Sequence, residues 1–144
     1  MRVLLDTHAF LWYVLEDRRL SDAARAAIEG DASAASVDQP LAGVRQDAPE
    51  VLVSPASYWE IAIKISLGKY ALTVPYETFW RSGIELNDFH VLPIEIRHTA
   101  LLLSLPYHHK DPFDRLLLAQ AMVENVPVVS SDSTLDAYPI TRLW

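Results

Sequence analysis

The sequence predicts an α/β protein, a three-layer α/β/α sandwich with a central parallel sheet of four to five strands. Apolar runs of four or five residues alternate along the chain with longer segments that can form helices. This order is typical of a parallel sheet covered by helices on both faces. Of the 144 residues, 51% are hydrophobic, which is enough to bury a substantial core in one domain spanning residues 1–144.

The expected strands are apolar runs that end at polar or turn-forming residues. They cover residues 2–5, 51–53, 90–94 and 126–130, with an edge strand at residues 140–143.

The expected helices begin at cap residues. Ser54 and Asp111 each precede a proline at the first helical position, where its missing N–H costs nothing. The segment after Asp111 has the strongest amphipathic pattern. The helices cover residues 9–15, 22–29, 56–67, 76–87, 97–105 and 112–124, and a short helix follows Asp132.

Residues 31–50 interrupt this alternation. Ala, Asp, Gln and Ser dominate the segment, and two prolines and a glycine break any period. Because no apolar face can be drawn through it, we expect a flexible insertion within the domain.

The formal net charge of −7 is unusual for a protein that binds nucleic acid, which needs a basic face. Bound cations at an acidic site, or a basic partner on the surface, would each account for it. The absence of cysteine excludes disulfides and thiolate metal sites. With no signal peptide and no membrane span in the sequence, we expect a cytoplasmic protein.

Acidic residues occupy the ends of the predicted strands. Asp6 directly follows the first strand and Asp132 the fourth, Glu60 lies in the helix that leaves the second, and Asp114 lies in the first turn of the helix before the fourth. In open parallel sheets, ligands bind beyond the carboxyl ends of the strands. Carboxylates without thiols or zinc-spaced histidines favour Mg²⁺ or Mn²⁺, and such a site suits phosphodiester hydrolysis.

Most of these acids also have a plainer structural interpretation. Asp6 and Asp132 could cap the helices that follow them. Glu60 could form a capping box with Ser57, or an i,i+4 ion pair with Lys64. In a functional site, Lys64 would offset negative charge or contact a phosphate.

The motif D-P-F-D contains two acids with different expected roles. Asp111 is well placed as an N-cap, whereas Asp114 lies on the helix face that carries Leu117, Leu118 and Ala121. A carboxylate buried there is costly unless it is paired or binds a metal. A functional role for Asp114 is therefore favoured.

The histidines and tryptophans carry a weaker signal. His108 and His109 could orient the Asp111 loop or touch a substrate, but we expect solvent-exposed loop residues. We interpret Trp12, Trp59 and Trp80 as core residues rather than as platforms for base stacking.

Four segments together resemble the PIN-domain proteins, and more narrowly the VapC-type toxins of bacterial type II toxin–antitoxin pairs. They are LLDTHAFLW, SPASYWEIAIKISLGKYAL, HHKDPFDRLLLAQAMVENVPVVSSD and YPITRLW. The resemblance covers nearly the whole chain in order and leaves out only about residues 31–50.

The resemblance implies a Mg²⁺-dependent endoribonuclease. It places the four acids of the family on Asp6, Glu60, Asp114 and Asp132, and the small hydroxyl residue on Thr7. It chooses Asp114 over Asp111 because the family's acid precedes the apolar helix, and its fourth acid is the most variable.

The resemblance also implies an RNA substrate, a homodimer and a cognate antitoxin whose tail enters the acidic groove. Two other functions remain open from the residues. One is a catalytically silent interaction module with the same fold. The other is a metal-dependent phosphatase or phosphotransfer domain, although no lysine follows the fourth strand, where such a domain needs one.

Overall fold

The structure is a computed structural model that describes residues 1–30 and 48–144. Most of the insertion expected at residues 31–50 lies outside the described residues. Its expected end at Glu50 was wrong, because the Glu50 N–H donates to the Met1 carbonyl (2.8 Å) and Glu50 pairs with Arg2 in the sheet.

The strands and helices follow one another in the predicted order. The strands are β1 (Arg2–Leu5), β2 (Glu50–Val53), β3 (His90–Val91), β4 (Val128–Val129) and β5 (Arg142–Leu143). The helices are α1 (Thr7–Val14), α2 (Asp22–Glu29), α3 (Pro55–Ser66), α4 (Tyr76–Glu85), α5 (Ile96–Leu101) and α6 (Pro112–Glu124), with a 3-10 helix η2 (Ser133–Ala137).

Strands β3 and β4 are shorter than predicted. The predicted segments contain Pro93 and Pro127, and proline has no N–H to give to a neighbouring strand. The regular ladder is therefore confined to His90–Val91 and Val128–Val129.

The five strands form one parallel sheet, as predicted, and their order in it is β3-β2-β1-β4-β5. The chain builds outward from β1 to β3 and then returns to the other side of β1 with β4. The strand order therefore reverses between β1 and β4, and the carboxyl ends of these two strands flank the switch point where such sheets bind ligands.

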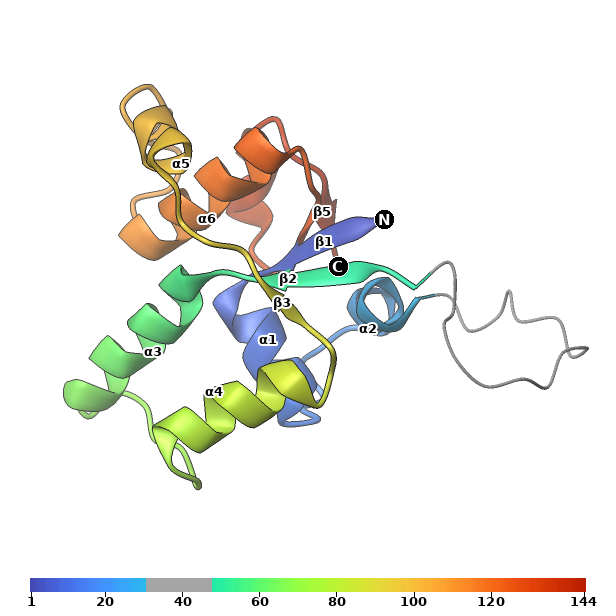
Figure 1. The fold of residues 1–144 in the computed structure, drawn as a ribbon. Coiled ribbons are helices and arrows are strands. Elements are labelled where there is room, and N and C mark those ends of the chain that lie inside the picture. The colour runs from blue at the N-terminus through green and yellow to red at the C-terminus, as the bar shows by residue number, and fades with distance from the viewer. Residues whose placement is uncertain (31–47) are drawn as a thin grey trace, which may run out of the picture.

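Alternating residues of β1 enter different cores, which confirms the three layers. Val3 and Leu5 pack in a core with residues of α1, α2 and α4, whereas Leu4 packs on the other side with residues of α6. All three β1 side chains are fully buried. Figure 1 shows α1, α2 and α4 on one face of the sheet and α5 and α6 on the other.

Helix α6 differs from the expected amphipathic helix, because every residue from Arg115 to Ala121 is buried. The sheet, α3 and α5 all pack against it. The buried Gln120 amide donates to the carbonyls of Leu92 (3.2 Å) and Pro93 (3.3 Å), and its oxygen accepts from the Ser54 hydroxyl. Gln120 thus links α6 to the end of β3 and to the start of α3.

An aromatic cluster fills the core under α4. The Phe10 ring stacks on Trp80 at a centroid distance of 4.5 Å, which confirms the core position expected for Trp80. Gly83 faces this ring from α4. A Cβ added at Gly83 would lie 2.9 Å from the Phe10 Cζ and 3.3 Å from a Val14 methyl carbon, which is too close for ordinary contact.

No helix in the described ranges 1–30 and 48–144 combines the length and the apolar character that crossing a membrane requires.

Because a Cβ at position 83 would lie too close to Phe10 and Val14, the replacement Gly83→Ala should lower the free energy of unfolding. Alanine normally stabilises a helix interior by roughly 0.5–1 kcal/mol relative to glycine, but overpacking a core costs about 1–3 kcal/mol. We expect a net loss of about 1 kcal/mol in urea denaturation. In a Phe10→Leu background, where the ring is gone, the same replacement should be neutral or stabilising. A Gly83→Ala protein more stable than the wild type would show that the contact is not tight.

Candidate active site

Asp6 lies at the carboxyl end of β1, next to β4. Its N–H donates to the Val129 carbonyl (3.1 Å), and its carboxylate accepts the Ala9 N–H (2.7 Å), so it also caps α1. The residue is 6% exposed. Burial raises the pKa of Asp6, although hydrogen bonds from Ser130 and Ala9 oppose the shift.

Glu60 is buried in α3, and both of its carboxylate oxygens have partners. The Thr7 hydroxyl donates to Oε1 (2.7 Å), and the Lys64 Nζ lies 2.6 Å from Oε2. The i,i+4 pair with Lys64 therefore forms. The capping box with Ser57 does not, because the N-cap of α3 is Ser54.

The two acids at the start of α6 make different contacts, and Asp111 is the N-cap, as the sequence indicated. Asp111 caps the helix by accepting the N–H groups of Phe113 (2.9 Å) and Asp114 (3.1 Å). The Asp114 side chain, one-third exposed, is directed towards His109, whose Nε2 lies 3.2 Å from its Oδ2.

The pKa of Asp114 is raised to about 7. Burial is the largest cause, and the negative charges of Asp111, Glu60 and Asp6 add to it, while His109 opposes it. Carboxylates from β1, α3 and α6 thus act on one another at this edge of the sheet. A divalent cation bound here would supply the positive charge that these carboxylates lack.

Asp132 follows β4 and caps η2. Its Oδ1 accepts the N–H (3.0 Å) and the hydroxyl (2.7 Å) of Thr134, and its Oδ2 lies 2.8 Å from the Nε2 of His109. Burial opposes ionisation of Asp132, but the hydrogen bonds from Thr134 and His109 outweigh it and lower the pKa.

His109 was expected to be a solvent-exposed loop residue, and that expectation was wrong. Its side chain is 15% exposed and joins Asp114 to Asp132. The contact with Asp132 spans 23 residues, so the sequence pattern does not reveal it. The local signal that distinguishes His109 from His108 is its position two residues before the Asp111 cap.

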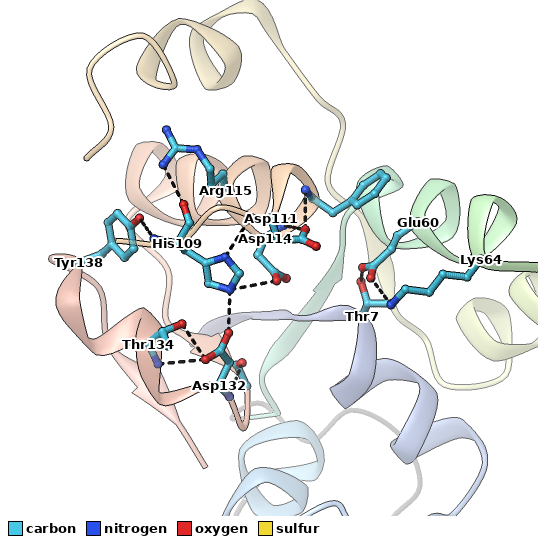
Figure 2. Close-up of polar contacts among 12 residues, drawn as sticks. Thr7, Glu60, Lys64, His109, Asp111, Asp114, Arg115, Asp132, Thr134 and Tyr138 are labelled. Carbon is cyan, nitrogen blue, oxygen red and sulfur yellow. Dashed lines mark hydrogen bonds and ion pairs between the residues drawn. The ribbon is translucent and has the colours of Figure 1, made fainter. Parts of the chain in front are cut away.

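The structure brings some of the predicted acids closer together than others. Among the described residues, His109, Asp114 and Asp132 can each offer one ligand atom with all three atoms within 4.8 Å of one another. Asp6 and Glu60 contact local partners instead, although their charges reach Asp114. Figure 2 shows Glu60 with Thr7 and Lys64 as one group, and His109 with Asp114 and Asp132 as another.

These donors fit a hard divalent cation. All four acids offer carboxylate oxygens, which are the ligands that Mg²⁺ and Mn²⁺ prefer.

Trp59 was expected in the core and is instead 58% exposed. It lies on the outer side of α3 and packs edge-on against Phe113 of α6, at a centroid distance of 5.1 Å. Trp12 is partly buried and packs against the core, beside Trp144.

The chain was compared with curated proteins and with solved structures, and both comparisons gave matches along nearly its whole length. A curated relative, "Ribonuclease VapC22" of Mycobacterium tuberculosis, is 29% identical over 149 residues, covering 99% of this chain and 98% of the relative.

Two of the solved structures with this fold are VapBC proteins. VapBC2 from Rickettsia felis, bound to a DNA fragment from its promoter, matches with a TM-score of 0.62 and 12% identity over 99% of this chain and 97% of that one. VapBC-1 from nontypeable Haemophilus influenzae matches with a TM-score of 0.57 and 16% identity over 99% of this chain and 96% of that one.

A family model described as the PIN domain matches residues 3–140. The chain belongs to the PIN domain family.

Proposed function

We propose that the chain is a divalent-metal-dependent endoribonuclease and the toxin of a type II toxin–antitoxin pair. The observation that carries the proposal is the gathering of acids at the sheet's switch point. Asp6 follows β1, Asp132 follows β4, and Asp114 can offer an oxygen within 4.8 Å of the ligand atoms of His109 and Asp132. Membership of the PIN family and the likeness to a relative named as a ribonuclease support it.

The residues proposed to hold the cation, Mg²⁺ or Mn²⁺, are Asp6, Glu60, Asp114 and Asp132. When bound, the ion would offset the negative charge of the phosphodiester and would lower the pKa of the attacking water. Asp114 is the central acid in this assignment. It contacts His109, which also contacts Asp132, and the charges of Asp6 and Glu60 raise its pKa.

Three neighbours support these acids. Thr7 fixes the orientation of Glu60 by donating to Oε1. Lys64 offsets the charge of Glu60, and its partly exposed side chain would contact an RNA phosphate. Asp111 acts through the backbone, because it holds the first turn of α6 from which Asp114 projects.

The proposed partners are those that the family resemblance implies, and charge and exposed apolar surface support them. A cluster of acids in a chain of net charge −7 suits the basic tail of a cognate antitoxin. Ile96 and Leu103, at the two ends of the α5 region, are 88% and 92% exposed, and we assign this surface to a homodimer. An enzyme that cuts cellular RNA would act in the cytoplasm.

The replacement Asp114→Asn should lower the rate of RNA cleavage by a factor on the order of 10²–10³, because it removes charge where the cation is held. The measurement is single-turnover cleavage of a labelled single-stranded RNA, with circular dichroism to confirm folding. Asp88→Asn is the matched control. Asp88 is exposed, has a φ of 54° that asparagine tolerates, and lies next to β3. Normal cleavage by Asp114→Asn would refute the assignment.

Removal of divalent cations should abolish cleavage by the wild-type protein, and Mg²⁺ or Mn²⁺ should restore it. Calorimetry with Mn²⁺ tests binding independently of activity. Full cleavage after exhaustive chelation would contradict the metal dependence. A folded wild-type protein that neither binds Mn²⁺ nor cuts RNA would favour the silent interaction module. A trapped phospho-aspartate would favour the phosphotransfer alternative.

A further inference from the structure

The imidazole of His109 uses both of its nitrogens. Nδ1 accepts the backbone N–H of Asp111 at 3.1 Å. Nε2 lies 2.8 Å from the Oδ2 of Asp132 and 3.2 Å from the Oδ2 of Asp114. The ring therefore stands between two carboxylates that come from different elements, as Figure 2 shows.

The contact at Nδ1 decides which ring nitrogen carries the proton. A nitrogen that accepts an N–H has its lone pair in that hydrogen bond, so the neutral imidazole carries its proton on Nε2. That N–H then donates to Asp132 and leaves no lone pair for a metal ion. The cluster of His109, Asp114 and Asp132 is thus a pair of carboxylates joined by a hydrogen-bond donor, rather than three ligands.

Two buried side chains hold the backbone of His109 in place. The Arg115 guanidinium, in a residue that is 5% exposed, donates to the carbonyls of His109 (3.2 Å), Pro106 (2.8 Å) and Leu105 (3.0 Å). The Tyr138 hydroxyl accepts the His109 N–H (2.8 Å) and donates to the Pro106 carbonyl (2.7 Å). The imidazole is therefore anchored independently of the acids that it contacts.

The anchored donor fixes the orientation of Asp132. Oδ1 already accepts two hydrogen bonds from Thr134, so the donor at Oδ2 determines how the carboxylate is turned. The same donor faces Asp114 and offsets the repulsion between two like charges that must stay close together.

We propose that His109 is a positioning residue whose Nε2–H holds Asp132 beside Asp114, ready for a divalent cation that His109 itself does not ligate. This inference rests on the function proposed above. Hydrogen-bonding partners of metal ligands typically account for 10- to 100-fold in metal affinity.

The test compares Mn²⁺ affinity, measured by calorimetry, in three full-length variants. His109→Ala should weaken the affinity by about tenfold. His109→Gln should recover most of the loss, because an amide N–H can replace Nε2–H. His90→Ala is the matched control, since His90 is exposed on the edge strand β3 and should bind Mn²⁺ like the wild type. Urea denaturation without metal separates a loss of affinity from a loss of folding.

Pulsed electron paramagnetic resonance of Mn²⁺ bound to the wild-type protein is a second readout that needs no variant to fold. We expect no coupling from a directly bound nitrogen. Such a coupling, lost in His109→Ala, would make His109 a ligand and overturn the inference.

Two results from the variants would also overturn it. One is wild-type Mn²⁺ affinity in a folded His109→Ala protein, and the other is a His109→Gln protein as weak as His109→Ala. If the wild-type protein binds no Mn²⁺ at all, the proposed function fails, and this inference fails with it.

Discussion

Repulsion between carboxylates at one edge of a parallel sheet is the constraint on which the rest of this structure depends. A buried carboxylate is tolerated only where hydrogen bonds or positive charge offset the loss of water. Asp6 accepts a hydrogen bond from a backbone N–H of α1. Glu60 pairs with Lys64 and accepts a hydrogen bond from Thr7, and Asp132 accepts one from Thr134. Asp114 has the least such support, and its pKa is about 7.

Structural and functional interpretations of these acids do not exclude one another. Asp6 and Asp132 cap helices, as the plainer interpretation of the sequence predicted, and they also stand at the reversal of strand order. A cap fixes the side chain close to the backbone, so capping supplies some of the rigidity that a binding site needs. Local and functional constraints therefore select the same residue type at the same place.

Local signals account for what the sequence predicted correctly. The caps at Ser54 and Asp111 act within three residues, and the parallel order of the strands follows from their alternation with helices. Contacts between distant segments account for what it did not predict. His109 joins its partner across 23 residues, and Trp59 is exposed although its sequence neighbours are apolar. The burial of α6 on several sides also depends on how α3 and α5 pack against it.

The buried side chain of Gln120 links the two helices that carry Asp114 and Glu60. Its side chain ties α6, which carries Asp114, to the hydroxyl at the beginning of α3, which carries Glu60. The two helices that carry these carboxylates are therefore joined through an amide that solvent does not reach. A change at this position in the interior of α6 would alter how both helices pack, and so would act on the acids from a distance.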